Sequence, residues 1–303
     1  MSSGEDACTG RPPRWRVWLS ATRPRTLAAA VAPVVVGTAL ALRDGHFSMA
    51  AAALCLAFAL LIQIGTNFSN DYHDFMKGAD TPGRLGPRRA VAAGLVSPSS
   101  MRTAAILAMA AAFLVGLGLV GRGGPWLLAV GILSIACGLA YTGGPYPLGY
   151  HGFGDVCVFV FFGLVAVCAT YFVQAGQVTA EALLAAFPIG LLAANILLVN
   201  NYRDSETDTI AGKRTLVVRF GRRIARVQHA ASLGVSLAMP FAFLLRGDGA
   251  FCLLPVAMAP LALSHVSRLK SDPTPPQLIA LLGNTSGFLA VYAALAASGF
   301  LLR

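Results

Sequence analysis

Charged residues are scarce in this chain of 303 residues, in which Asp, Glu, Lys and Arg make up 12% and only 13 residues are acidic. Soluble domains carry about 25% charged residues. The chain is instead 56% hydrophobic, with a mean hydropathy of +0.68. This composition excludes an ordinary soluble domain and predicts an integral membrane protein.

Cysteine is sparse and scattered as well. None of the six cysteines falls in a CxxC pair or at metal-ligand spacing with histidine, and all but Cys8 lie in apolar runs. The pattern therefore argues against a zinc site or a disulfide framework and favours small buried apolar side chains. A cleavable signal peptide is not evident either, because the first apolar run follows a polar, Arg-rich segment and is long enough to stay in the membrane.

Long apolar runs predict an all-α membrane fold with nine transmembrane helices. Each run is close to the ~20 residues that a helix needs to cross a bilayer. The predicted spans are residues 26–43, 49–70, 101–121, 125–142, 155–174, 181–202, 226–245, 249–267 and 279–301. We expect residues 1–14 to form a disordered cytoplasmic tail and residues 15–303 to form one intramembrane domain.

The net charge of +10 follows the membrane and is not a signal for nucleic acid. With the N-terminus in the cytoplasm, the nine spans place all but four of the 23 Lys and Arg residues on the cytoplasmic side. The four exceptions are Arg43, Arg122, Arg246 and Arg303. The positive-inside rule therefore predicts a cytoplasmic N-terminus and a C-terminus outside. We expect a multi-pass protein of the plasma membrane.

Two polar clusters stand at the ends of the second and sixth spans and hold six of the acidic residues. Carboxylates near lipid are costly, so such a concentration indicates a functional site. Residues three or four apart share a helix face, and both clusters have that spacing. The first cluster contains Asn67, Asn70, Asp71 and Asp74, and the second contains Asn200, Asn201, Asp204 and Asp208.

Oxygen ligands of this kind suit Mg²⁺, which proteins hold with one or two carboxylates together with substrate phosphates. Two facing clusters could bind two Mg²⁺ ions bridged by a diphosphate, with the nearby cations Lys77, Lys213 and Arg214 neutralising the remaining charge. Such a site would promote the ionisation of an allylic diphosphate. The plain alternative is that these residues are solvated acids in loops. A single Asp-x-x-Asp motif would favour that alternative, but two matching clusters do not.

Several motifs carry a resemblance that runs from about residue 15 to residue 300. They are Asn70, Asp71 and Asp74, then Asp204 and Asp208, and the segments Gly212–Leu216, Arg23–Leu27, Gly86–Ala90 and Tyr141–Gly149, with Gly154 and Asp155. In these motifs the chain resembles intramembrane aromatic prenyltransferases of the ubiquinone-biosynthesis type. Within that family it is similar to the branch that acts on 1,4-dihydroxy-2-naphthoate in menaquinone synthesis.

The resemblance implies helices around a central cavity that opens sideways to membrane lipid. It also implies two Mg²⁺ ions and two substrates, a polyprenyl diphosphate and 1,4-dihydroxy-2-naphthoate, which is prenylated with loss of CO₂ to give demethylmenaquinone. The catalytic residues would be Asp71, Asp74, Lys77, Asp204 and Asp208. Many relatives have a further Asp where this chain has Gly78, and we expect Asp80 to take its place as a metal ligand.

Other candidates for substrate binding have equally plain alternatives. Arg23 and Arg25 would also serve as positive-inside determinants, Tyr141 and Tyr146 as interface anchors, and Asp155 as a helix N-cap. Aromatic side chains in and beside the fifth span could line an apolar tunnel and stabilise a carbocation. They are Phe153, Phe159, Phe161, Phe162 and Tyr171.

Two other functions stay open from the sequence. One is prenylation of a different aromatic acceptor, such as 4-hydroxybenzoate. The other is ion-coupled transport, because carboxylates in membrane segments also mark ion pathways. Transport needs polar groups near the middle of the membrane, and the first, third, seventh and eighth spans have almost none.

Overall fold

The computed structural model describes residues 12–80, 85–86 and 89–302. All regular structure within these residues is helical, which confirms the predicted all-α class. Of the predicted tail, residues 1–11 lie outside the described residues. So do Pro87 and Arg88 of the Gly86–Ala90 motif, and Arg84 and Arg303 of the charge pattern.

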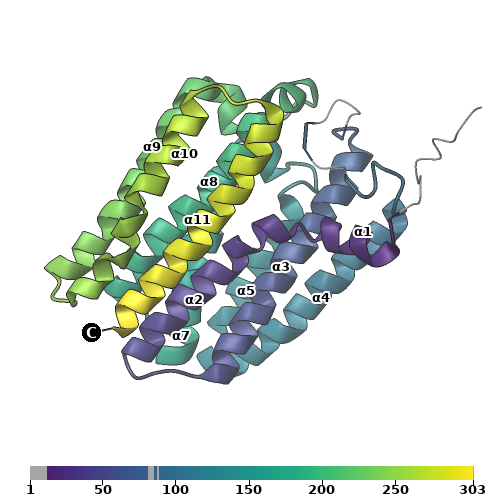
Figure 1. Ribbon diagram of the computed structural model, residues 1–303. Helices are drawn as coiled ribbons and strands as arrows, with labels where there is room; N and C mark the ends of the chain where they lie inside the picture. Colours follow the sequence, from purple (N-terminus) through teal and green to yellow (C-terminus); the bar gives the residue numbers. More distant parts are fainter. Residues whose placement is uncertain (1–11, 81–84, 87–88, 303) are drawn as a thin grey trace, which may run out of the picture.

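The described helical elements follow one another along the chain, with the longest connection between α3 and α4 (Figure 1). They are α1 (Arg14–Ala21), η1 (Pro24–Thr26), α2 (Ala28–Arg43), α3 (Met49–Met76), α4 (Pro98–Gly123), α5 (Trp126–Ala140), η2 (Leu148–His151), α6 (Gly154–Val158), η3 (Phe159–Val165), α7 (Ala166–Ala175), α8 (Ala180–Ile210), α9 (Leu216–Leu245), η4 (Ala250–Met258), α10 (Ala259–Lys270) and α11 (Pro275–Leu301).

Each predicted span coincides with one helix or with a run of consecutive helical segments. In the described part of the chain, seven of these are long and apolar enough to cross a membrane. The helix α2 reaches that standard only together with the preceding α1 and η1, from which it is bent by 54°. The helix α5 has 15 residues, fewer than the ~20 of an ordinary span. The multi-pass membrane fold is confirmed, while the count of nine stays a prediction.

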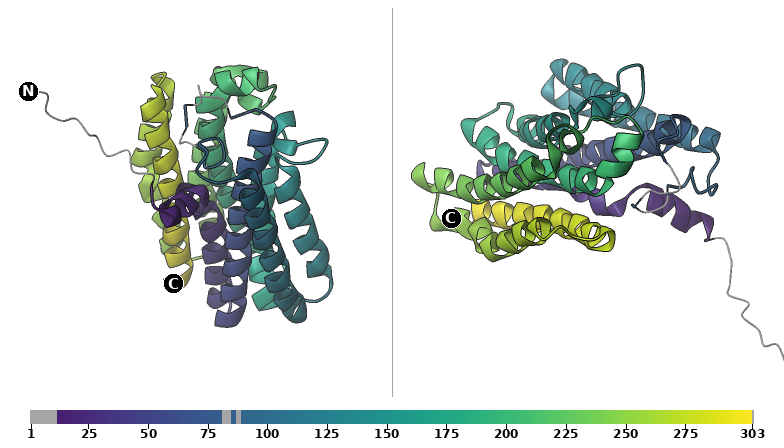
Figure 2. Two further views of the ribbon diagram at one scale, coloured as in Figure 1. Left: turned by 90° about the vertical axis from the view of Figure 1, so that its right-hand side faces the viewer. Right: turned by 90° about the horizontal axis from the view of Figure 1, so that it is seen from above.

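The helix α8 lies at the centre of the bundle. In its most apolar stretch 72% of the residues are buried, compared with 22% in α3 and in α4. It packs against α9, α11, α2 and the run from α6 to α7, and α11 packs in turn against α2. The first and last predicted spans therefore meet, which closes the bundle around α8 (Figures 1 and 2).

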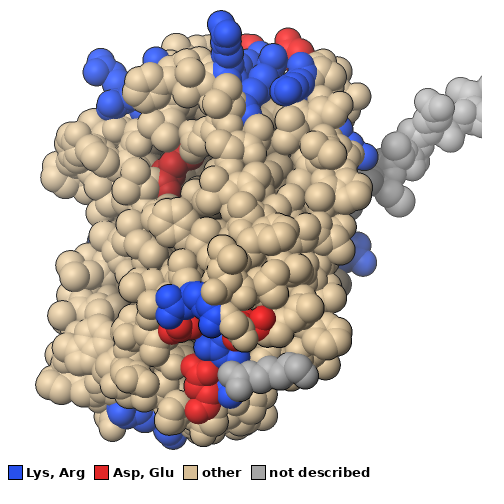
Figure 3. All heavy atoms as spheres, turned by 90° about the vertical axis from the view of Figure 1, so that its left-hand side faces the viewer, with Lys and Arg blue, Asp and Glu red and all other residues tan. Residues whose placement is uncertain are grey.

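A broad apolar belt surrounds the bundle between two charged ends. Figure 3 shows this on the face formed by α9 and α10, where Lys and Arg gather at one end and a mixed group of charges lies near the other. Large apolar side chains within the belt are exposed, including Leu107 at 64% and Leu263 at 70%. Because helices pair most of their backbone groups internally, such a surface suits contact with lipid.

Close backbone contact joins η3 to α8. A Cβ on Gly163 would lie 2.6 Å from the Cα of Gly190, so neither position has room for a side chain. The segment η3 is π-helical, a rare conformation that is frequent at functional sites. It turns Phe161 and Phe162 toward the interior cavity.

We expect a reporter fused after Arg303 to lie outside the cytoplasm, and one inserted between α8 and α9 to lie inside. The physical basis is the strongly uneven distribution of Lys and Arg between the two sides of the predicted spans. Protease protection or cysteine labelling in oriented vesicles would measure both positions. A cytoplasmic C-terminus would mean that the short helix α5 does not complete a span.

Candidate active site

The last three turns of α3 carry a buried strip of polar side chains. Asn67, Asn70, Asp71 and Asp74 lie on one face of the helix and all are buried. The amide of Asn67 donates to the carbonyl of Thr22 at 2.9 Å, which ties α3 to the segment before α2. The solvated-loop alternative is therefore wrong for this cluster, because buried carboxylates must be compensated by specific partners.

A loop folds over this strip and supplies those partners. The backbone amides of Ala90 and Val91 donate to the two carboxylate oxygens of Asp71 at 3.1 and 3.3 Å. The guanidinium of Arg89 donates to Asp74 at 2.7 Å and lies 3.3 Å from Asp80. Burial disfavours the charge on Arg89, yet the neighbouring carboxylates, Asp74 first, outweigh it and raise its pKa. Arg89 is thus a fixed positive charge between two carboxylates.

The last turns of α8 carry the second strip. Asn201, Asp204 and Asp208 are buried, and Arg203 is only 1% exposed. Arg203 donates twice to the carboxylate of Asp204, at 2.7 and 2.6 Å, and once to the side-chain oxygen of Asn200 at 2.8 Å. The contact between Arg203 and Asp204 is thus bidentate, which is the strong form of a charge-assisted hydrogen bond. Asp204 therefore has a defined orientation.

Lys213 connects the two strips. Its ammonium lies 3.3 Å from Asp74 on α3 and 3.8 Å from Asp208 on α8. The chain reaches this position because α8 ends at Ile210 and Gly212 turns the backbone with a positive φ of 71°, a conformation that glycine adopts readily. One carboxylate of each cluster therefore lies beside the same ammonium group.

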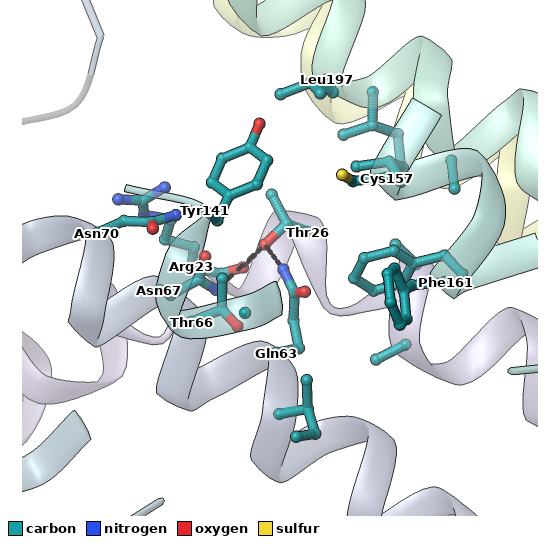
Figure 4. Close-up of a pocket in the computed structure, with 18 of the residues that line it drawn as sticks. Arg23, Thr26, Gln63, Thr66, Asn67, Asn70, Tyr141, Cys157, Phe161 and Leu197 are labelled. Atoms are coloured by element: carbon teal, nitrogen blue, oxygen red, sulfur yellow. Dashed lines mark hydrogen bonds between the residues drawn. The ribbon is translucent and has the colours of Figure 1, made fainter. Parts of the chain in front are cut away.

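Both strips open on a single interior cavity of about 820 Å³. Its polar end holds the carboxylates, and its body is apolar, with Phe58, Ile62, Leu119, Leu127, Phe161, Phe162 and Val173 among the residues that line it. Figure 4 shows Arg23 and Asn70 on one side of this space and Cys157 and Phe161 on the other. A ligand with a charged head and a long apolar tail fits such a cavity.

Tyr150 of η2 stands at the rim of the polar end. Its hydroxyl donates to Asp74 at 2.7 Å, beside Lys77 and Lys213. Burial, together with the charge of Asp74, raises the pKa of Tyr150, so that the hydroxyl keeps its proton. Burial and the charge of Lys213 lower the pKa of Lys77, and Asp74 opposes part of that change.

Most of the predicted site residues meet at the cavity. Those that line it are Arg23, Arg25, Asn67, Asn70, Asp71, Asp74, Tyr141, Asn200, Asn201, Asp204, Asp208 and Lys213. Lys77 donates to the carbonyl of Thr142 at 2.6 Å, just beside the cavity lining, and Asp80 pairs with Arg89. Of the predicted aromatic side chains, Phe161 and Phe162 line the cavity.

The remaining candidates lie elsewhere. Tyr146 is exposed and stacks on His151, with ring centroids 3.7 Å apart. The side chain of Arg214 is exposed, while its backbone amide donates to the carbonyl of Tyr150 at 2.7 Å. Asp155 is buried in the first turn of α6 and accepts a hydrogen bond from Gln228 at 3.2 Å. Their roles in binding stay predictions.

Four residues of the site were not among the predicted ones. Arg89, Tyr150 and Arg203 hold the carboxylates, and the hydroxyl of Thr142 donates to Asn70 at 2.7 Å. Arg89 and Thr142 lie inside motifs already noted, so the motifs themselves were a usable signal. Tyr150 directly follows the Tyr141–Gly149 motif, and Arg203 lies between Asn201 and Asp204 of the second cluster. Only the folded chain shows their contacts.

The donor chemistry of the site fits Mg²⁺, because the two strips offer carboxylate and amide oxygens. In this conformation positive charge already lies between the carboxylates, from Arg89 between Asp74 and Asp80 and from Lys213 between Asp74 and Asp208. No three His, Cys, Asp or Glu side chains of the described residues form a ready metal cluster. Metal binding at Asp74 would therefore have to displace Arg89 or Lys213.

A bundle of membrane helices around a cavity with a polar, carboxylate-lined head and an apolar body defines a class: membrane-embedded proteins that bind an amphipathic molecule. The model of the UbiA prenyltransferase family matches residues 30–290. The chain therefore belongs to the UbiA prenyltransferase family.

Two curated relatives are similar to this chain in sequence, and one solved structure is similar in fold. The chain is 41% identical over 284 residues to the 1,4-dihydroxy-2-naphthoate octaprenyltransferase of Mycobacterium tuberculosis, covering 94% of this chain and 96% of the relative. It is 42% identical over 230 residues to the Escherichia coli protein of the same description, covering 74% and 75%. A UbiA homolog from Archaeoglobus fulgidus bound to DMAPP and Mg²⁺ shares the fold, with a TM-score of 0.66, 16% identity, and coverage of 93% and 99%.

Proposed function

We propose that this protein is a Mg²⁺-dependent prenyltransferase that transfers a polyprenyl group from polyprenyl diphosphate to 1,4-dihydroxy-2-naphthoate, with loss of CO₂. The observation that carries the proposal is the meeting of two carboxylate strips at the head of one apolar cavity. The curated relatives, described as 1,4-dihydroxy-2-naphthoate octaprenyltransferases, support the choice of acceptor.

The prenyl diphosphate would enter with its head between α3 and α8. Asp71, Asp74, Asp204 and Asp208, with Asp80 beside them, would hold two Mg²⁺ ions, as the two cation positions between these carboxylates suggest. When bound there, Mg²⁺ supplies positive charge that stabilises the departing diphosphate. Lys77, Lys213 and Arg89 stand close enough to neutralise the rest.

The reaction breaks one C–O bond and one C–C bond and forms one C–C bond. The C–O bond pair of the allylic diphosphate leaves with the diphosphate, and the ring carbon that bears the carboxylate attacks the allylic carbon. The carboxylate then departs as CO₂, and its bond pair returns to the ring, which yields the prenylated quinol. The buried, apolar cavity keeps water from the cation, and the faces of Phe161 and Phe162 can stabilise it.

The aromatic acceptor needs a cation or a hydrogen-bond donor for its carboxylate on the cavity side of the carboxylate strips. Arg23, Arg25 and Tyr141 line the cavity, and Figure 4 shows Arg23 and Tyr141. Arg23 also has a positive φ of 52°, a strained conformation for a residue other than glycine that is typical of functional positions. Arg23 is therefore the first choice for holding the carboxylate.

The same proposal includes the surroundings of the reaction. The domain spans residues 15–303 in nine helices of the plasma membrane, with the N-terminus and the active site on the cytoplasmic side. Membrane lipid borders the apolar belt, and no nucleic acid takes part. Prenylation of 4-hydroxybenzoate is the competing reaction within the family.

The decisive experiment supplies 1,4-dihydroxy-2-naphthoate labelled in its carboxyl carbon, together with a polyprenyl diphosphate and Mg²⁺. We expect labelled CO₂ to be released in a one-to-one ratio with the prenylated quinol. Trapped CO₂ and the extracted lipid product would be measured side by side. An Asp74→Ala variant in the same membranes controls for spontaneous decarboxylation.

Two outcomes would contradict the proposed acceptor. One is a prenylated product that retains the label, which would mean attack at another ring carbon. The other is turnover with 4-hydroxybenzoate alone. Lack of prenyl transfer to any aromatic acceptor would overturn the enzyme assignment as a whole.

A further inference from the structure

One aromatic ring holds two cations from opposite halves of the chain. The ammonium of Lys77, which follows α3, lies 4.9 Å from the ring centre of Tyr150. The ammonium of Lys213, which follows α8, lies 4.8 Å from the same ring centre. Each contact is a cation–π interaction of ordinary geometry. Tyr150 therefore fixes the positions of both lysines relative to each other.

The same residue is bonded to the first carboxylate strip and to the loop that follows the second. Its hydroxyl donates to the Oδ1 of Asp74 at 2.7 Å, the same atom that Lys213 approaches at 3.3 Å. Its backbone carbonyl accepts from the amide of Arg214 at 2.7 Å, which anchors the loop after α8. Tyr150 thus connects the end of α3 to the segment that carries Lys213.

Two ammonium groups on one ring repel each other, so the arrangement needs anionic charge nearby. Asp74 supplies one negative charge, which Lys213 shares with Arg89. Asp80 and Asp208 balance further charge on Arg89 and Lys213, whereas Lys77 donates to the neutral carbonyl of Thr142. An anionic head group such as a diphosphate would give the two ammonium groups on this ring a shared counter-charge.

We propose that Tyr150 is a positioning residue for the diphosphate of the prenyl donor, holding Lys77 and Lys213 with its ring and Asp74 with its hydroxyl. The inference rests on the proposed function, since it requires a diphosphate at this end of the cavity. It assigns the two parts of the side chain to different tasks: the ring orders the lysines that bind the head group, and the hydroxyl orients a carboxylate of the reaction centre.

Two substitutions separate these tasks. Tyr150→Leu removes the ring, and we expect the KM for prenyl diphosphate to rise about tenfold, which corresponds to the loss of two exposed cation–π contacts. Tyr150→Phe keeps the ring, so the donor KM should stay near the wild-type value while kcat falls several-fold. The KM for the aromatic acceptor should change in neither variant.

Binding is measured apart from turnover by titrating inorganic diphosphate with Mg²⁺ into the full-length protein in detergent. The affinity of Tyr150→Leu should fall about as much as its donor KM rises, and that of Tyr150→Phe should match the wild type. Tyr171→Phe is the matched control, because it removes another hydroxyl bonded to a carboxylate at 2.7 Å, here Asp44 at the opposite end of the bundle.

A double-mutant cycle excludes a general folding effect. In a Lys77→Gln/Lys213→Gln background, Tyr150→Leu should cost little further affinity, because the ring acts through those lysines. An additive loss would overturn the inference, as would a wild-type affinity in Tyr150→Leu. Wild-type protein that fails to bind diphosphate at all would instead count against the proposed function.

Discussion

Replacing Asp71, Asp74, Asp204 or Asp208 by alanine, one at a time, should lower the turnover number at least about 100-fold, as the loss of one electrostatic stabiliser of a transition state often does. Each carboxylate lies at the head of the cavity, where the leaving diphosphate would be held. Turnover would be measured as prenylated product formed per enzyme at saturating substrates. Near-normal turnover in any two of the four variants would contradict the paired-strip assignment.

The folding of these variants should differ in a way that the structure predicts. Asp204→Ala leaves the guanidinium of Arg203, which is 1% exposed, without its carboxylate, and breaking a buried ion pair costs about 3–5 kcal/mol. Asp71 is bonded to backbone amides, so Asp71→Ala should be milder. Asp248→Ala serves as a control, because its carboxylate pairs with Arg43 at the other end of the bundle.

Removing divalent metal should abolish turnover, and adding Mg²⁺ back should restore it, with Mn²⁺ replacing Mg²⁺ in part. The diphosphate and the carboxylate strips are both negatively charged, so they repel each other unless cations lie between them. Initial rates against free Mg²⁺, buffered by a chelator, would give the dependence. Full turnover in excess chelator would contradict the proposal of two metal ions.

The metal should also be visible without turnover. Mg²⁺ added together with inorganic diphosphate should raise the melting temperature of the detergent-solubilised protein, since ligands that bind only the folded state stabilise it. The same addition should have little effect on an Asp71→Ala/Asp208→Ala double variant. An equal rise in both proteins would place the metal elsewhere.

The helices were predictable because membrane spans are long and uniformly apolar. Every predicted span coincides with helical structure, and α3 and α8 end within or just after the polar clusters that the sequence marked. The bend of 54° between η1 and α2 was not predictable in the same way. Nor was the π-helical segment η3, because its contact with α8 depends on two glycines that meet only in the folded bundle.

The residues of the site were likewise predictable where they lie on helices and not where they lie in loops. The strip with Asn70, Asp71 and Asp74 follows from helical periodicity, which places residues three and four apart on one face. The residues that cover the strip come from loops, which have no period to analyse. Arg89 contacts Asp74 across 15 positions and Tyr150 contacts it across 76, and no local pattern in the sequence indicates such pairs.

The ion pairs that neutralise the site have a consequence for the order of binding. A bare Mg²⁺ ion would displace Arg89 or Lys213 from Asp74 and leave that cation with only its longer contact, to Asp80 or Asp208. A prenyl diphosphate that arrives with the metal supplies the lost counter-charge, so metal and donor should each raise the affinity of the site for the other by the same factor. Prenyl alcohols and prenyl monophosphates carry too little charge to complete the exchange. The intramolecular ion pairs would then make binding selective for lipids whose head group can pair with the displaced arginine or lysine.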